Sequence, residues 1–175
     1  MSKPFQAISG IRTALLFSVM VFLSACGQQA TDNGAERPLT EEDKLAIIEK
    51  CNSLTNAWLA GDKDKILYHY SWDAVLIPHH GEEQIVGRDA IERYWFNPLY
   101  APPKVHRMDN NVLEVVGAGN YAFARGRGML DYEFQNVHYS NTGNFFHVFR
   151  RNNNGDWEIY RHVWTDPVPV QKQPQ

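Results

Sequence analysis

Four long segments in the second half of the chain have side-chain patterns with a period of two, and they constrain its fold more than any other feature. They are residues 105–117, 120–134, 143–151 and 156–165, and the turn sequence NNNG joins the last two. A period of two is typical of β-strands, and a turn of this composition between two of them indicates a hairpin. The sequence therefore predicts a large antiparallel sheet, with a shorter strand earlier in the chain at 73–79.

The segment before the sheet has helical periodicity instead. Thr40 followed by Asp43 resembles a capping box, and Gly61 is a typical helix stop. Two shorter helices, at 63–71 and 90–96, are expected to follow. Helices that precede a meandering sheet predict the α+β class. The apolar residues of the first helix recur at helical spacing: Ile47, Cys51, Leu54 and Trp58.

The N-terminus has the composition of a secretory signal. Lys3 and Arg12 precede the apolar run TALLFSVMVFL, and small residues follow it. The run is shorter than the roughly 20 residues that a membrane-spanning helix needs. The sequence LSAC, which ends at Cys26, resembles the lipobox of bacterial lipoproteins. That resemblance implies a lipid on Cys26 and a place in the cell envelope, on the periplasmic face of the outer membrane. The alternative is an ordinary signal peptide whose cleavage site adjoins a cysteine.

Composition changes divide the chain into four parts. Residues 1–25 are the expected signal, and residues 26–38 are polar and small, as in a flexible tether. Residues 39–166 are enough for one domain with a single core. Residues 167–175 contain three prolines and are expected to be unstructured.

Cysteine usage and charge exclude several classes of protein. The only cysteines are Cys26 and Cys51, so lipidation of Cys26 would leave Cys51 without a disulfide partner. The formal net charge is −3, and removal of the signal with Lys3 and Arg12 makes it more negative by two. A mildly acidic chain without a basic run is a poor candidate for binding nucleic acid. Membrane contact is therefore expected through lipid alone.

Three blocks of sequence carry a family resemblance. They are AWLAGDKDKILYHYSWDAVLIP at 57–78, VGRDAI at 86–91 and VFRRNNNGDWEIYRHVW at 148–164. In this order they resemble the superfamily of nuclear transport factor two, ketosteroid isomerase and the SnoaL-like cyclases, over residues 45–164. The resemblance implies a cone-shaped, curved antiparallel sheet wrapped around about three N-terminal helices. It further implies an apolar pocket at the open end and a convex face that forms a homodimer. It does not fix a function, because this fold hosts enzymes, binding proteins and assembly modules.

The resemblance also places the catalytic roles of ketosteroid isomerase on this chain. The general base falls on Ile77, the tyrosine of the oxyanion hole on Leu54, and the protonated aspartate on His147. Two of the three residues have no acid-base chemistry. Isomerisation by that mechanism is therefore not expected.

The strand NFFHVFRR is apolar on both faces. Phe145, His147 and Phe149 share one face, and Phe146 and Val148 share the other. In a sheet with one solvent-exposed face, apolar and polar residues should alternate along each strand. Two apolar faces predict a pocket on the side of His147 and a partner subunit on the other side.

By this placement His147 points into an aromatic pocket, the usual surroundings of a small-molecule site. The candidate catalytic groups are His147, His162 and Asp73, because imidazoles and a carboxylate can exchange protons near neutral pH. Alternatives remain: a core histidine bonded to its neighbours, a cone filled by its aromatics, and an Asp73 that bonds to backbone in a turn. The residues expected to line the pocket are Trp58, Tyr68, Tyr70, Trp95, Phe145, Tyr160 and Trp164.

The sequence offers few charged residues as candidates for ligand binding and no pattern of metal ligands. Arg125 and Arg127 share a strand face with aromatic residues, and Arg125 is expected on the concave side, where it could bind an anionic group. On the convex side it would form surface pairs instead. The seven histidines show no spacing typical of metal ligands, so no metal site and no cofactor are predicted.

Three functions remain compatible with this pattern. The first is a lipid-anchored protein that binds a small molecule without transforming it. The second is a SnoaL-like lyase, isomerase or cyclase that uses the pocket histidines. The third is a protein-interaction module of the envelope, which a stable homodimer through Trp157, Ile159 and Val163 would argue against.

Overall fold

The computed structural model describes residues 37–79, 81–165 and 170–171, all of which belong to one compact unit, Asp32–Gln175. The signal segment and Cys26 lie outside the described residues, so the predictions made for them stay predictions. Within the described part of the chain, no helix has the length and apolarity needed to cross a membrane.

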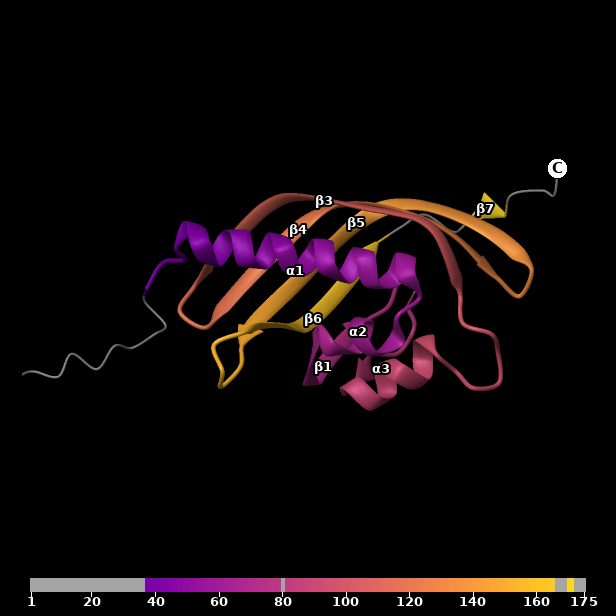
Figure 1. Cartoon of the computed structure of the whole chain (residues 1–175), viewed down its shortest axis with the longest axis horizontal. Coiled ribbons are helices and arrows are strands. Elements are labelled where there is room, and N and C mark those ends of the chain that lie inside the picture. The colour runs from indigo at the N-terminus through magenta and orange to yellow at the C-terminus, as the bar shows by residue number, and fades with distance from the viewer. Residues whose placement is uncertain (1–36, 80, 166–169, 172–175) are drawn as a thin grey trace, which may run out of the picture. The chain divides into compact units, whose positions relative to one another are not determined.

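The described domain has three helices and one curved sheet (Figure 1). The order along the sheet is β2-β1-β6-β5-β4-β3, and β7 pairs with β5. Neighbouring strands are antiparallel, except that β1 and β6 run parallel. The predicted α+β class, with a curved sheet and three helices, is confirmed. The elements are α1 (Glu41–Ala60), α2 (Lys63–Tyr68), β1 (Tyr70–Ile77), β2 (Ile85–Val86), α3 (Arg88–Trp95), β3 (Lys104–Ala118), β4 (Tyr121–Phe134), β5 (Val137–Arg151), β6 (Trp157–Thr165) and β7 (Val170–Gln171).

The sheet extends further at β5 than the sequence predicts. β5 begins at Val137, six residues before the predicted start, and it therefore extends beyond β6. The free edge of this extension pairs with β7, so Val170–Gln171 form a short strand within the segment expected to be unstructured. An unpaired strand edge offers backbone hydrogen-bonding groups to any nearby extended segment, which explains the pairing.

α1 begins and ends as the sequence predicts. The Thr40 hydroxyl accepts a hydrogen bond from the backbone N–H of Asp43 at 3.1 Å, and the Asp43 carboxylate accepts one from the backbone N–H of Thr40 at 3.1 Å. At the other end Gly61 has φ 64°, a left-handed conformation that glycine adopts without strain. Both helix ends are thus satisfied by residues next to them in the chain.

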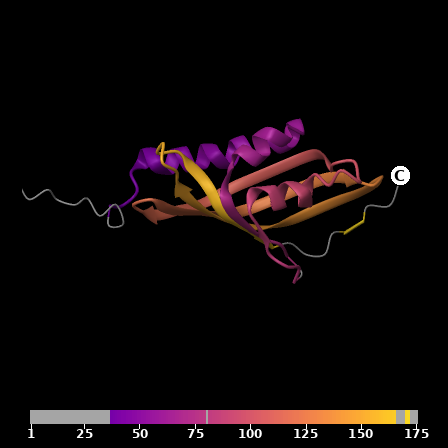
Figure 2. The same cartoon turned by 90° about the horizontal axis from the view of Figure 1, so that it is seen from below.

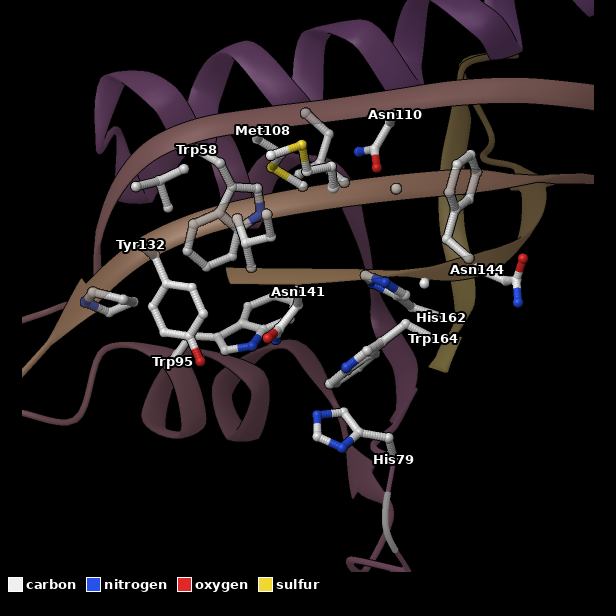
Figure 3. A pocket seen from close by; sticks show the side chains of 18 of the residues that line it. Trp58, His79, Trp95, Met108, Asn110, Tyr132, Asn141, Asn144, His162 and Trp164 are labelled. Atoms are coloured by element: carbon white, nitrogen blue, oxygen red, sulfur yellow. The ribbon is translucent and has the colours of Figure 1, made fainter. Parts of the chain in front are cut away.

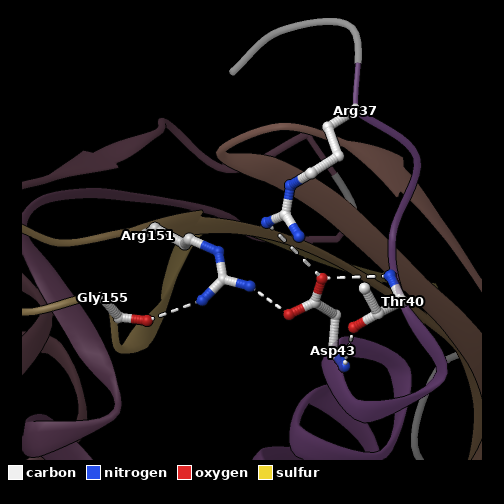
Figure 4. Close-up of polar contacts among 5 residues, drawn as sticks. All are labelled: Arg37, Thr40, Asp43, Arg151 and Gly155. Atoms are coloured by element: carbon white, nitrogen blue, oxygen red, sulfur yellow. Dashed lines mark hydrogen bonds and ion pairs between the residues drawn. The ribbon is translucent and has the colours of Figure 1, made fainter. Parts of the chain in front are cut away.

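Asp43 also joins α1 to the β5–β6 hairpin (Figure 4). Arg151 donates to the Asp43 carboxylate and, at 2.8 Å, to the carbonyl of Gly155 in the hairpin turn. Burial raises the pKa of the Asp43 carboxyl, but hydrogen bonds from Thr40 and Arg151 outweigh it and hold that pKa below its usual value. Asp43 is therefore ionised and fixes the start of the helix against the sheet.

Replacing Asp43 with asparagine tests this link. Asparagine can still accept the Thr40 hydrogen bond, so the substitution mainly removes the charge and leaves Arg151 without its partner. We expect the free energy of unfolding to fall by about 2–3 kcal/mol, measured by urea denaturation. Lys44→Met, which removes the exposed Lys44–Glu41 pair at 2.6 Å, is the control and should change stability little. Equal effects of the two substitutions would contradict a structural role for Asp43.

α1 lies along one face of the sheet, here called the concave face (Figures 1 and 2). In the first half of β4 this face carries only small residues, of which Ala122 and Ala124 are buried in the core with α1. Gly126 follows them, and a Cβ placed there would lie 2.6 Å from the ring of Phe145. Small side chains let the helix and the neighbouring rings approach the strand closely. The alternating arginines of the same strand must therefore project from the opposite, convex face.

β6 contains a β-bulge that the sequence pattern did not predict. Val148 of β5 pairs with Arg161, whereas the next residue, Phe149, pairs with Ile159. Tyr160 is thus an extra residue with no partner of its own in this ladder. An extra residue shifts the alternation by one. Odd-numbered residues before the bulge and even-numbered residues after it therefore face the same side of the sheet.

The bulge changes which residues of β6 face the helices. Trp157 and Ile159 come before it and are buried in the core at 3% and 1% exposure. His162 and Trp164 come after it and face the same side of the sheet, where they line a cavity. The prediction that grouped Tyr160 with His162 and Trp164 is therefore wrong, and Trp157 and Ile159 cannot form a dimer surface.

Candidate functional site

A cavity of about 450 Å³ lies between the concave face of the sheet and the helices (Figure 3). α1 and α3 supply one wall, and β3, β4, β5 and β6 supply the other. The described residues that line it include no Asp, Glu, Lys or Arg. They are Leu54, Trp58, His79, Tyr94, Trp95, Pro103, Val105, Met108, Asn110, Gly128, Met129, Leu130, Tyr132, Phe134, Asn141, Gly143, Asn144, Phe145, His147, His162, Trp164 and Thr165.

Aromatic rings from the helices form one side of the cavity. Trp58 of α1 meets Trp95 of α3 edge to face, with ring centroids 5.1 Å apart, and stacks on Phe96 at 5.7 Å. Trp95 in turn packs against the buried Tyr70 at 5.4 Å. Edge-to-face and offset contacts of this kind hold the rings in fixed orientations. The helical wall is therefore rigid and predominantly apolar.

Tyr70 lies directly behind the histidine of β6. Its hydroxyl is 2.7 Å from Nδ1 of His162, and the two rings stack at 5.9 Å. Tyr70 is fully buried, and burial raises its pKa, so its hydroxyl keeps its proton. A buried hydroxyl proton needs an acceptor, and Nδ1 of His162 is the acceptor within reach. In this arrangement the neutral His162 ring carries its own proton on Nε2.

His147 occupies the centre of the sheet wall. Its ring lies 4.3 Å from that of His162 and 5.0 Å from that of Phe145. Nδ1 is 3.9 Å from the Sγ atom of Cys51, whose thiol stays protonated because burial raises its pKa to about 12. Nε2 is buried and has no hydrogen-bond partner among the described residues. Because His147 is one of the residues that line the cavity, this nitrogen is a candidate hydrogen-bonding group for a molecule bound there.

Both imidazoles are neutral. Burial lowers the pKa of His147 to about 3 and lowers that of His162 well below its usual range. The two rings are also in contact with each other, so protonation of one would further oppose protonation of the other. The cavity consequently presents hydrogen-bonding groups without charge.

Three asparagines on the strands add polar groups that the sequence prediction missed. Asn110 donates to the Thr55 hydroxyl at 3.0 Å, and Asn144 donates to that of Thr165 at 3.4 Å. The Oδ1 atom of Asn141 is buried without a partner among the described residues. The sequence did contain a signal for Asn141. The alternation of β5 continues toward the start of the strand and places residue 141 on the same face as His147.

The structure brings together most of the predicted site residues. Trp58, Trp95, Phe145, His147, His162 and Trp164 all line the cavity. Tyr70 contributes from a second layer through its bond to His162. The cone is therefore not filled by its aromatics, which was one of the alternatives left open by the sequence.

Two other predicted residues lie elsewhere because of the elements that carry them. Tyr68 is 65% exposed, because α2 ends there and the chain turns so that Tyr70, two residues on, enters the core as the start of β1. Tyr160 is the bulge residue, and its ring lies 4.2 Å from the Arg150 guanidinium, away from the cavity. Neither the Tyr68 nor the Tyr160 side chain lines the cavity.

The two charged candidates also lie outside the cavity. Asp73 accepts two hydrogen bonds from Arg150, at 2.6 and 3.0 Å, which lower its pKa and occupy both of its oxygens. Arg125 lies on the convex face and pairs with Glu114 at 2.5 Å. Its expected concave position is wrong, because the small residues of β4 occupy that face. Neither Asp73 nor Arg125 can act on a molecule bound beside His147.

Comparison with known proteins finds similarity of structure only. No family model matches the sequence, and no curated protein matches it. A ketosteroid isomerase-like protein from Erwinia carotovora atroseptica superposes with a TM-score of 0.63 at 20% identity, over 74% of this chain and all of that one. A nuclear transport factor two-like superfamily protein from Salmonella enterica gives 0.59 at 16% identity, over 71% and 91%. A Catenulispora acidiphila protein, solved in complex with S-DNPA, gives 0.60 at 14% identity, over 73% and 95%.

Proposed function

We propose that this chain, which has the nuclear transport factor two-like fold, binds a small uncharged molecule with an apolar or aromatic body and does not transform it. The observation that carries the proposal is the buried, unpartnered Nε2 atom of His147, a residue that lines the cavity. A buried polar atom left without a hydrogen bond costs about 1–3 kcal/mol. A ligand that supplies the missing partner would offset that cost.

The size and lining of the cavity support a small-molecule ligand. Its volume of about 450 Å³ lies within the roughly 300–1,000 Å³ of typical ligand sites. Its walls are mainly apolar and aromatic, with a few amide and imidazole groups. A charged ligand would lose its hydration without meeting an opposite charge on the described lining, which is unfavourable. The similar Catenulispora acidiphila protein was solved in complex with S-DNPA, in agreement with a binding use of the fold.

Binding is favoured over catalysis by the weak basicity of the histidines. General bases work best with a pKa near the operating pH, and the pKa of His147 is about 3. No carboxylate among the described lining residues is available to raise it. The ring can therefore accept or donate a hydrogen bond at neutral pH, but it gives little driving force for removing a proton.

The proposal is tested by what the protein carries when it is purified. Native mass spectrometry of the full chain, extracted in mild detergent, should show an added mass of one small molecule per chain. Crystals of the same material should show density beside His147. A protein without added mass whose cavity holds only water, even after incubation with cell extract, would argue against a binding function.

One observation favours a second function, a lyase, isomerase or cyclase of the SnoaL-like type. Tyr70 and His162 form a hydrogen-bonded pair that could relay a proton to a substrate beside His147. Turnover assays on wild type and His147→Gln separate the two functions. Turnover that disappears in the variant would support catalysis, and equal turnover in both would exclude His147 as the base.

Lipid attachment is a separate part of the proposal. The LSAC sequence that ends at Cys26 and the polar stretch after it support a chain held by lipid on the periplasmic face of the outer membrane. Cells that express wild type or Cys26→Ala can be labelled with radioactive palmitate. We expect label and outer-membrane fractionation for the wild type alone. Label retained on Cys26→Ala would show that Cys26 is not the site.

A second copy of the chain is proposed to cover the convex face. Leu113, Val116 and Phe146 are exposed there, and Phe146 stacks on Phe123 at 5.1 Å. The nearby Glu114 and Arg125 pair with each other, so these two residues add no net charge to a patch that can face a copy of itself.

Sedimentation of wild type and Phe146→Glu tests this dimer. A dimer that dissociates in the variant is expected. A monomeric wild type would overturn it and would favour the third function, a module that binds another envelope protein.

A further inference from the structure

Three strands bring two histidines and one glutamate together at the end of the sheet farthest from the β5–β6 hairpin. His138 of β5 is the direct partner of Glu133 of β4. His106 is an extra residue of β3, because Val105 and Arg107 on either side of it pair with consecutive residues of β4. The linear spacing of 106, 133 and 138 resembles no metal-binding motif. Only the register of the three strands makes the side chains neighbours.

The three side chains converge on one point. Nε2 of His138 lies 3.4 Å from Oε2 of Glu133, and Nε2 of His106 lies 3.6 Å from the same oxygen. The two imidazole rings stack at 5.4 Å with an angle of 26° between their planes. The ligand atoms of the three residues all lie within 4.8 Å of one another. Their side chains are 32–51% exposed, so an ion can reach them from solvent.

We propose that His106, Glu133 and His138 bind one divalent transition-metal ion, with zinc as the best fit. Zinc binds imidazole nitrogen and carboxylate oxygen at about 2.0–2.2 Å in a tetrahedron, which sets neighbouring ligand atoms about 3.4 Å apart. The two nitrogen-to-oxygen separations already have nearly this value. Three protein ligands leave a fourth position open for water or for an added ligand.

A metal explains the arrangement better than ion pairs alone. The nitrogen-to-oxygen separations of 3.4 and 3.6 Å are longer than the roughly 2.7–3.2 Å of a good hydrogen bond, so Glu133 does not bind either imidazole closely by itself. A zinc ion binds both rings in their neutral form and supplies the positive charge itself. The prediction from the sequence that there is no metal site used spacing along the chain, which cannot detect ligands on three different strands.

The position of the site connects it to the cavity. Glu133 lies between Tyr132 and Phe134, which line the cavity, and successive residues of a strand point to opposite faces. Val105, next to His106, lines the cavity as well. A bound ion would hold the ends of β3, β4 and β5 together behind this part of the wall.

The test is a zinc titration of the full chain, free of affinity tags, extracted in mild detergent and stripped of metal with a chelator. Calorimetry with zinc chloride should show saturable binding of one ion per chain. Loss of any ligand, in His106→Gln, Glu133→Gln or His138→Gln, should weaken binding at least tenfold, since even indirect partners of metal ligands have effects of about 10–100-fold. Magnesium chloride should show no saturable binding, because hard cations prefer oxygen ligands.

Two controls match the ligand substitutions. His79→Gln removes an imidazole outside the three residues, and Asp109→Asn removes an exposed carboxylate of the same strand, β3. Both should bind zinc as the wild type does. Zinc should also raise the Tm of the wild type and of both controls but not of His138→Gln, because an ion that binds only the folded chain stabilises it.

Two results would overturn the site. No saturable zinc binding by the wild type would mean that the three residues form an ion-pair cluster only. Binding that persists unchanged in His106→Gln, Glu133→Gln and His138→Gln would place the ion elsewhere. Anomalous scattering from zinc-soaked crystals locates the ion directly.

Discussion

Lowering the pH from 7 to 5 is expected to destabilise the folded domain by several kcal/mol, because its buried histidines stay neutral while those of the unfolded chain take up protons. His147 has a folded-state pKa of about 3, and that of His162 is also far below the ordinary 6.5. His69, which is buried as well, has a pKa lowered to about 4 by burial and by Lys50. Each of these rings should remove about 2 kcal/mol of stability at pH 5.

The direction of the effect follows from proton uptake. Between pH 6.5 and about 3 the unfolded chain binds a proton at position 147 and the folded chain does not. Stability is therefore complete above pH 6.5 and falls as the pH drops toward the folded-state pKa. Urea denaturation at several pH values measures this slope. Stability that does not change between pH 7 and 5 would mean that these imidazoles are open to solvent.

Two variants assign part of the slope to His147. His147→Gln removes one titrating group, so the slope should decrease by roughly 1.4 kcal/mol per pH unit between pH 6 and 4. Cys51→Ala alters the neighbour of His147, and the pKa of Cys51, about 12, lies outside this range. That variant should be less stable at every pH but keep the wild-type slope. A reduced slope in Cys51→Ala would show that packing, and not proton binding, causes the pH dependence.

Gly126→Ala is expected to destabilise the folded domain strongly. A Cβ at position 126 would lie 2.1 Å from the backbone oxygen of Asn111 and 2.6 Å from the ring of Phe145. The Asn111 oxygen belongs to the backbone of β3 and cannot move without displacing that strand, and the Phe145 ring is buried and has little room to rotate. Strand propensity alone would favour alanine over glycine, so the two effects have opposite signs. We expect sterics to dominate and stability to fall by about 2–3 kcal/mol.

Gly128→Ala is the matched control, since it makes the same change two residues along the same face of β4. Its nearest neighbour is the side-chain oxygen of Asn110, at 2.9 Å from the added carbon, and a side chain can rotate away. Thermal and urea denaturation of the two variants should differ clearly, with Gly128→Ala close to wild type. Similar stabilities would mean that Gly126 is not required for close contact with Phe145.

The parts of the fold that depend on neighbouring residues were predictable from the sequence. The capping box of Thr40 and Asp43 and the stop at Gly61 act within a few residues of the helix ends, and the structure has both. The resemblance over three blocks predicted the curved sheet. It also predicted the inward direction of His147, because the alternation in β5 has no interruption near that residue.

The parts that depend on pairing between strands were not predictable. The bulge at Tyr160 inserts a residue in β6 without any local signal, so alternation assigned the wrong face to Tyr160, Trp157 and Ile159. The face of Arg125 depended on which side of β4 packs against α1. The small residues on that side were the usable signal, but the prediction used alternation alone.

The most direct test of an uncharged ligand site compares two probes that share one ring system. Trp58, Trp95 and Trp164 line the cavity, so tryptophan fluorescence of the full chain reports binding. We expect 1-naphthol to quench saturably and 1-naphthoate, its anionic counterpart, to bind at least about tenfold more weakly, because no cationic side chain lies among the described lining residues. His147→Phe, which removes Nε2, should weaken 1-naphthol binding by roughly tenfold. Equal affinity for the two probes, or no saturable quenching by either, would contradict a neutral binding cavity at His147.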